Sequence, residues 1–271
     1  MCDVCVMNSV KERMLTRRDM FRGGLAVGAG LTAAGLGTAA RADAHGSVFD
    51  MTHAYGPDFP TYFGEPGIAM EQTFNFADNG FNLFQLSLNE HTGTHIDAPL
   101  HFSADGRSVD ELEVGDLVVP LCVVDIREKA AADADAQVTP DDLEAWIAEH
   151  GDIPDRACVA MLSGWADKVA TDAFRNADDE GTMHFPGFHP EATALLLERS
   201  SAAAMAVDTL SLDHGPSSDF ATHYAWLPTG RYGIECLAGL EQVPAAGATL
   251  VVGAPKHRGG TGGPARIFAM I

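Results

Sequence analysis

The segment EHTGTHIDAPLHF, residues 90–102, restricts its own backbone more than any other stretch of this sequence. Its threonines, glycine and proline all oppose a helix. In a straight strand His91 and His95 would lie about 13 Å apart, because an extended chain rises ~3.3 Å per residue. Two histidines that share a metal ion must each place a ring nitrogen about 2.0–2.1 Å from it. The remaining arrangement is a strand that bends at Gly93, so that the two histidines converge and Asp97 adds an oxygen ligand.

The same segment concentrates chemistry in few residues. Three histidines and one aspartate fall on odd positions between residues 91 and 101. The preceding residues 82–90 read as a strand whose polar positions, Gln85, Ser87 and Asn89, lead toward this cluster. The alternative is a polar loop in which the histidines only form hydrogen bonds. A cluster of imidazoles beside a carboxylate favours a metal site over that alternative.

The rest of the chain predicts a mixed α/β domain with more strands than helices. A helix is expected over residues 140–150, because Thr139 can cap it, Pro140 suits its first turn and Gly151 can end it. A second helix is expected from about residue 190 to 200. β-branched or alternating apolar residues predict strands at 82–90, 117–126, 158–162, 203–208, 249–252 and 266–271.

Composition narrows the class of partner. The chain has 271 residues, enough for one large domain, and a formal net charge of −21. A surface this acidic repels phosphate backbones and anionic lipid, so we expect neither a nucleic-acid partner nor membrane binding by the mature form. Cys122 and Cys236 lie in apolar surroundings that suit buried free thiols. Cys2 and Cys5 resemble half of a redox or zinc motif but have no partner pair in the sequence.

The N-terminus has the pattern of an export signal. Arg17 and Arg18 precede a Gly-, Ala- and Leu-rich stretch, residues 23–40, that is followed by a small-x-small cleavage site ending at Ala42. Paired arginines before a weakly hydrophobic stretch resemble a twin-arginine signal. The alternative, a transmembrane anchor, fits poorly because the stretch is rich in glycine. We therefore expect a signal peptide at 1–42, a mature domain at 43–271 and a periplasmic location.

The histidine segment also resembles a family signature. The pattern H-x-G-T-H-x-D-x-P-x-H-F is similar to that of the cyclase family, which includes bacterial kynurenine formamidase and isatin hydrolase. Its fixed positions are His91, Gly93, Thr94, His95, Asp97, Pro99, His101 and Phe102. Further similarity lies at 163–165, 185–188 and 207–209, and in the twelve-residue spacing between His223 and Glu235.

The resemblance implies a swivelling β/β/α fold, a homodimer or homotetramer, and one or two divalent ions, Zn or Mn. The implied metal ligands are His91, His95, Asp97, His223 and Glu235. Asp97 would bridge the two ions, and His101 would stay unligated as the catalytic acid and base. Two departures from the formamidases leave the substrate and the ion count open. Cys236 follows Glu235, and the loop 211–217 is closer to the isatin hydrolases.

Three functions remain open at this point. The resemblance implies cleavage of an amide C–N bond in an N-formyl aryl amine such as N-formylkynurenine. A cyclic amide such as isatin is the alternative substrate, and a non-catalytic periplasmic metal-binding protein is the third hypothesis. His214 is a candidate ligand or pocket residue with an equal case for a structural role. The glycine-rich stretch 259–263 predicts a hairpin loop, because no Lys-Ser/Thr pair follows it to make a phosphate-binding loop.

Overall fold

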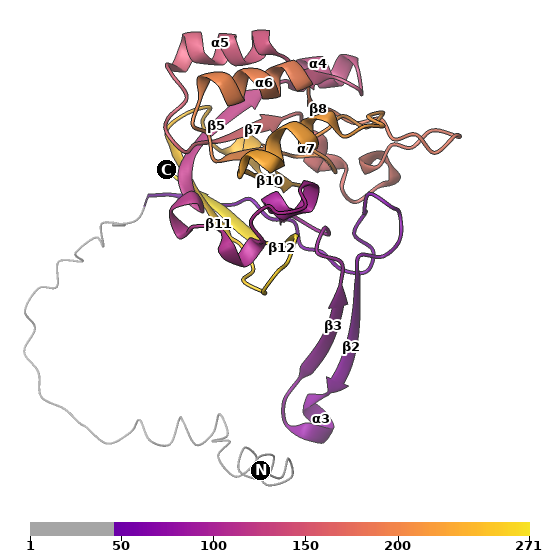
Figure 1. Ribbon diagram of the computed structural model, residues 1–271. Coiled ribbons are helices and arrows are strands. Elements are labelled where there is room, and N and C mark those ends of the chain that lie inside the picture. The colour runs from indigo at the N-terminus through magenta and orange to yellow at the C-terminus, as the bar shows by residue number, and fades with distance from the viewer. Residues whose placement is uncertain (1–45) are drawn as a thin grey trace, which may run out of the picture. The chain divides into compact units, whose positions relative to one another are not determined.

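The computed structural model describes residues 46–271 (Figure 1). The predicted signal peptide, Cys2 and Cys5 lie outside these residues. Contacts divide the chain into two units, of which one contains residues 70–86 and the other contains residues 45–69 and 87–271. Each unit is described by itself.

The larger unit is built on a mixed nine-stranded sheet with the order β1-β13-β11-β5-β7-β9-β10-β4-β12. Neighbours from β5 to β10 run parallel, and the pairs outside them are antiparallel. The strands are β1 (Val48–Asp50), β4 (His95–Asp97), β5 (Val118–Asp125), β7 (Cys158–Leu162), β9 (Ala204–Val207), β10 (Tyr232–Glu235), β11 (Ala248–Gly253), β12 (Gly262–Pro264) and β13 (Arg266–Met270). A separate two-stranded sheet pairs β6 (Gln137–Val138) with β8 (Gly187–Phe188).

The two faces of the sheet bury two different cores. Along β5, Leu121 and Val123 join one apolar cluster, while Cys122 and Val124 join another. This alternation follows from the two-residue period of a strand, and burial on both faces explains why the central strands are almost entirely apolar. The first cluster draws residues from nearly every strand of the sheet, which therefore curls around it.

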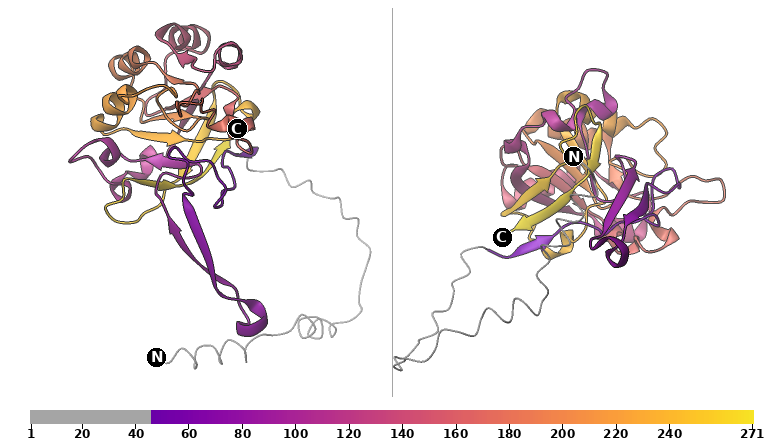
Figure 2. Two further views of the ribbon diagram at one scale, coloured as in Figure 1. Left: turned by 90° about the vertical axis from the view of Figure 1, so that its right-hand side faces the viewer. Right: turned by 90° about the horizontal axis from the view of Figure 1, so that it is seen from below.

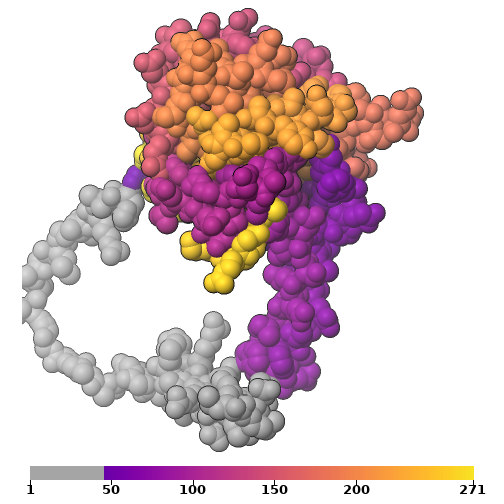
Figure 3. All heavy atoms as spheres, in the orientation of Figure 1, coloured from indigo at the N-terminus to yellow at the C-terminus, as the bar shows by residue number. Residues whose placement is uncertain are grey.

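Helices cover the second core. Figure 2 (left) shows them on one side of the sheet, and in Figure 3 the magenta-to-orange segments that contain them form the upper surface of the larger unit. Leu143, Trp146 and Leu196 are among the helical residues packed into this core. The helices of the described residues are α3 (Phe76–Asn79), α4 (Arg127–Ala132), α5 (Pro140–His150), α6 (Pro190–Arg199) and α7 (Ala221–Trp226).

The smaller unit contains most of the hairpin of β2 (Ile68–Phe74) and β3 (Leu83–Leu88), which flank α3. Asn75 caps α3 by accepting a hydrogen bond from the Asp78 N–H, and Gly80 ends it with a left-handed conformation. All six residues of β3 are exposed in the single chain, including four large apolar side chains: Leu83, Phe84, Leu86 and Leu88.

The elements expected from the sequence are present. α5 occupies the predicted residues 140–150, and the Thr139 hydroxyl and the Asp142 carboxylate form its capping box. The other helix and all six strands appear at their predicted places, with ends that differ by up to two residues. Cys122 and Cys236 are buried free thiols, as predicted. Among residues 46–271, no helix has both the length and the apolar character needed to span a bilayer.

A buried carboxylate joins the ends of β7 and β9. Asp208, directly after β9, accepts hydrogen bonds from the backbone N–H groups of Ser163, Gly164 and Trp165 and from the Ser163 hydroxyl. Burial raises the pKa of Asp208 to about 6, against the effect of these donors. The interaction fixes the turn after β7 in place.

Candidate metal centre

The centre of the site is β4, which lies between β10 and β12. The antiparallel register places Glu235 opposite His95 and Gly233 opposite Asp97. Directly opposed residues project from the same face of a sheet, so this pairing brings Glu235 beside His95. A Cβ on Gly233 would lie 3.3 Å from Asp97 Oδ2 and 3.0 Å from Leu212 Cδ1. Glycine at 233 therefore leaves room for the aspartate.

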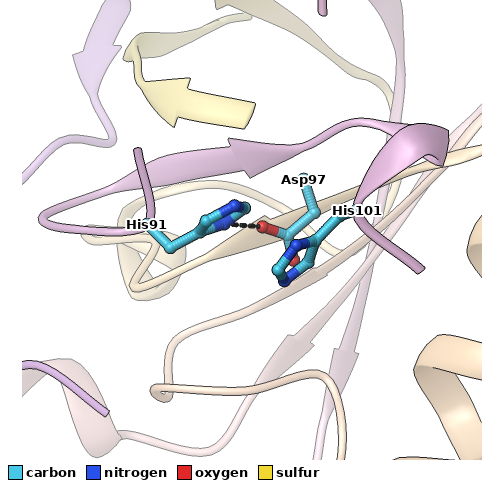
Figure 4. A group of neighbouring side chains, drawn as sticks. All are labelled: His91, Asp97 and His101. Carbon is cyan, nitrogen blue, oxygen red and sulfur yellow. Dashed lines mark hydrogen bonds and ion pairs between the residues drawn. The ribbon is translucent and has the colours of Figure 1, made fainter. Parts of the chain in front are cut away.

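The chain bends at Gly93, as the sequence predicts. Gly93 has a φ of 67°, and a Cβ there would lie 2.8 Å from the Tyr55 ring. Both facts favour glycine at this position. The bend brings the rings of His91 and His95 to a centroid distance of 5.3 Å. His101 follows on a 3-10 helix (Pro99–Phe102), and Figure 4 shows it beside Asp97 and His91.

The five predicted ligands converge. His91 Nδ1 lies 2.7 Å from Asp97 Oδ1, and His95 Nε2 lies 3.4 Å from the same oxygen. The other oxygen, Asp97 Oδ2, lies 3.5 Å from His223 Nε2. Glu235 completes the group, with Oε1 3.1 Å from His223 Nε2 and Oε2 3.3 Å from His95 Nε2. The two oxygens of Asp97 thus face different histidines, which is the geometry that a bridging carboxylate requires.

Burial and charge at this cluster suit a divalent cation. His95 Nε2 and Asp97 Oδ2 are buried and form no hydrogen bond, so both are free to act as ligands. Burial opposes ionisation of Asp97, but its close contacts with the imidazoles of His223, His91 and His95 hold its pKa well below the usual range. Two buried carboxylates among imidazole nitrogens make an electronegative pocket, and His95, Asp97 and Glu235 can together contact one ion. These residues therefore fit a metal.

Each of these histidines is also held at its other ring nitrogen. His95 Nδ1 lies 2.9 Å from the Gly93 carbonyl oxygen. His223 Nδ1 lies 2.6 Å from Asp213 Oδ2, and His91 Nε2 lies 2.9 Å from Thr261 Oγ1. Outer contacts of this kind orient metal-binding histidines and select their tautomer. Sequence reasoning missed Asp213 and Thr261, although it had marked the loop and the glycine-rich stretch that contain them.

His101 has the environment of a proton acceptor. Its ring stacks on His91 at a centroid distance of 3.8 Å with 21° between the planes. Burial lowers the pKa of His101 to about 4, so the imidazole is neutral near pH 7. His101 also lies close enough to His91 and Asp97 for the three to hold one ion. Its assignment as an unligated acid and base therefore remains a prediction.

The cluster opens into a cavity of about 410 Å³. Its apolar wall includes Phe59, Tyr62, Phe63, Phe102 and Phe220. Other large aromatic residues, Trp165, Phe188 and Trp226, are fully buried in the cores and do not line it. His214 is not among the lining residues, and its neighbour Asp213 contacts His223 instead. Phe220 and Cys236, both on the wall, have left-handed backbones that are uncommon outside glycine.

A larger cleft of about 1030 Å³ shares Phe59 and Pro60 with this cavity. Among the described residues, its lining contains none of the five predicted ligands and no histidine. We therefore assign the chemistry to the smaller cavity, in which polar groups converge against an apolar wall.

Comparison with known proteins agrees with this site. A family model described as "Putative cyclase" matches residues 49–214. Isatin hydrolase of Roseibium aggregatum is 34% identical over 244 residues, which cover 83% of this chain and 91% of the relative. The chain belongs to the cyclase family.

A second curated relative and a solved structure are also similar to this chain. Kynurenine formamidase of Salinibacter ruber is 28% identical over 225 residues, covering 81% of this chain and 95% of the relative. The structure of isatin hydrolase A from Labrenzia aggregata, bound to benzyl benzoate, matches with a TM-score of 0.78 and 34% identity. That match covers 83% of this chain and 93% of the other. The expected cyclase-like fold is confirmed, and the chain is an enzyme, a metal-dependent amidohydrolase of this family.

Proposed function

We propose that this cyclase-family enzyme hydrolyses the amide C–N bond of a cyclic aryl amide of the isatin type. The observation that carries the proposal is one cavity in which a buried cluster of imidazoles and carboxylates faces an aromatic wall. The wall suits a flat aromatic ring, and the cluster suits hydrolysis of a carbonyl group attached to it.

The donor set suits one or two divalent ions. Imidazole and carboxylate ligands are compatible with both Zn²⁺ and Mn²⁺. His91, His95 and Asp97 Oδ1 would hold one ion, and His223, Glu235 and Asp97 Oδ2 would hold the other. A bound cation of this kind lowers the pKa of water toward 7 and polarises the scissile carbonyl.

The chain's own residues supply proton transfer and orientation. His101 is neutral near pH 7 and lines the cavity, so it can accept the proton of the attacking water and pass it to the leaving nitrogen. Burial, Glu235 and Asp213 raise the pKa of Tyr62. The Tyr62 hydroxyl therefore stays protonated at the cavity wall, where it is available to donate a hydrogen bond to a substrate oxygen.

An N-formyl aryl amine such as N-formylkynurenine is the second candidate substrate. It offers the same aromatic ring and an amide carbonyl, and a named kynurenine formamidase is 28% identical to this chain. The cyclic amide is placed first because the named isatin hydrolase is more similar, at 34%, over a comparable share of the chain.

Parallel assays of the metal-loaded mature protein against isatin and N-formylkynurenine test the proposal. We expect the larger kcat/KM with isatin. A clear preference for the formamide would reverse the order, and turnover of neither compound by the metal-loaded protein would refute both candidate substrates.

We also propose a homodimer or homotetramer. Large apolar side chains on β2 and β3 are 43–48% exposed in the single chain, and exposed apolar surface of this kind marks association sites. Light scattering of the mature protein would test the oligomer. The periplasmic location remains a proposal that rests on the N-terminal sequence pattern.

A further inference from the structure

The glycine-rich stretch 259–263 has a position that its sequence did not explain. It brings Thr261 between two side chains of the histidine segment, Glu90 and His91. A Cβ on Gly260 would lie 2.5 Å from Glu90 Oε1, and one on Gly262 would lie 2.8 Å from His91 Cε1 and 2.2 Å from the Ile96 carbonyl oxygen. Side chains at 260 and 262 would therefore prevent this close approach, so the glycines are needed on both sides of Thr261.

Thr261 is held by a carboxylate through two hydrogen bonds. Glu90 Oε2 accepts one from the Thr261 backbone N–H at 3.0 Å and one from its hydroxyl at 2.6 Å. The second carboxylate oxygen, Oε1, forms a hydrogen bond with His257 Nε2. Glu90 is therefore anchored by His257 and oriented toward Thr261.

The direction of these bonds decides the tautomer of His91. A hydroxyl has one proton, and that of Thr261 is donated to Glu90. Thr261 Oγ1 can therefore only accept at its 2.9 Å contact with His91 Nε2, so Nε2 carries a proton. A neutral imidazole has one N–H, which leaves the lone pair on Nδ1. Nδ1 is the nitrogen that lies 2.7 Å from Asp97 Oδ1, on the side of the cluster.

We propose that Thr261 and Glu90, anchored by His257, are positioning residues that fix the Nε2–H tautomer of His91 and direct its Nδ1 to the metal. This inference rests on the proposed metal site and adds three residues to it. We call this series of hydrogen bonds, from Glu90 through Thr261 to His91, the relay. It differs from the contact at His223, where the Asp213 carboxylate accepts the imidazole N–H directly. It gives the 259–263 stretch a role in orienting a ligand rather than in binding phosphate.

Thr261→Val tests the relay with little change in shape, because it replaces the hydroxyl with a methyl group. Loss of an outer contact to a metal ligand typically weakens metal binding about 10–100-fold. We expect a loss in that range for zinc, measured by competition with a chelator. Thr261→Ser, which restores the hydroxyl, should recover most of the affinity. Thr171→Val is the matched control, because its hydroxyl also forms a hydrogen bond, to the Lys168 carbonyl, and Thr171 does not line the cavity. The control should bind zinc as the wild type does.

The ¹⁵N chemical shifts of labelled histidines in the zinc-loaded protein report the tautomer directly. In the wild type and in Thr261→Ser, His91 should show a protonated Nε2 and a metal-bound Nδ1. In Thr261→Val, this signal should shift or divide between states. Glu90→Ala provides a second route if Thr261→Val fails to fold, because it removes the acceptor of the Thr261 hydroxyl, which is then free to donate to His91 Nε2.

The outcomes separate the relay from the metal site itself. Wild-type zinc affinity and an unchanged His91 tautomer in both Thr261→Val and Glu90→Ala would overturn the relay and leave the proposed function standing. A wild-type protein that binds no zinc or manganese would instead refute the proposed metal site, and the relay with it.

Discussion

Replacing Glu235 by Gln tests whether this carboxylate holds a second ion. Glu235 Oε1 accepts a hydrogen bond from the Leu212 N–H at 3.0 Å, while Oε2 faces His95 Nε2. In the variant, the Leu212 N–H requires the amide oxygen at the Oε1 position. The amide NH₂ must then occupy the Oε2 position and point at His95. The side chain keeps its shape but loses its charge and one of its two acceptors, so we expect the second ion to be lost.

The expected size of the effect follows from linkage. An ion present at 100 times its Kd stabilises the folded state by about 2.7 kcal/mol, so two sites add roughly twice that amount. Loss of one site removes about 2.7 kcal/mol, and a domain of this size loses roughly 2–4 °C in Tm per kcal/mol. The metal-dependent rise in Tm should therefore be smaller by roughly 5–11 °C in the variant.

Two measurements check this expectation. Mass spectrometry of bound metal should give a ratio of about two ions per chain in the wild type and about one in Glu235→Gln. Thermal unfolding with and without metal should give the reduced rise in Tm, and kcat should fall steeply. Glu241→Gln is the matched control, because Glu241 is an exposed glutamate that does not line the cavity. A wild-type ratio near one that the mutation leaves unchanged would remove Glu235 from the ligand set and refute the two-ion geometry.

Four other changes have separate expected outcomes. His101→Ala should abolish turnover and leave the metal content nearly intact, as measured by mass spectrometry; loss of metal with activity would reassign His101 as a ligand. Asp97→Ala should lower both metal content and Tm, because it removes the carboxylate shared by both ions, and full occupancy with full activity would place the site elsewhere. Replacing Arg17 and Arg18 by Lys should keep the precursor folded and active in the cytoplasm, and unchanged periplasmic protein on cell fractionation would contradict the twin-arginine assignment. Asp208→Ala leaves three backbone N–H groups without their acceptor, at about 1–3 kcal/mol for each buried unpaired group. Urea unfolding should therefore show a loss of at least about 3 kcal/mol, and a loss below about 1 kcal/mol would contradict the role of Asp208 in joining β7 and β9.

Local features of the sequence were sufficient to predict the helices whose ends carry capping or terminating residues. α5 begins after Thr139 and ends before Gly151 because capping and termination depend on residues within one turn. The bend at Gly93 could also be predicted, since two histidines four residues apart cannot converge along a straight strand. Both arguments use only backbone geometry over a few residues.

Local features could not identify the predicted ligands that are distant in sequence from the histidine segment. His223 and Glu235 lie more than 120 residues after His95, and only the family resemblance pointed to them. Strand pairing decides their position, because the register of β4 with β10 places Glu235 opposite His95. A slip of one residue would turn Glu235 to the other face of the sheet. No local pattern in either strand specifies that register.

By itself, the sequence determined which residues could be ligands, where the chain must bend and which segments become helices or strands. The tertiary structure alone decided which atoms of those residues face the cluster. Asp213, Thr261 and Glu90 carry no local signal, because each acts through hydrogen bonds to residues brought close by folding. A hydrogen bond depends on tenths of an ångström and on the direction of a single proton. That geometry exists only when β4, β10 and β12 are paired.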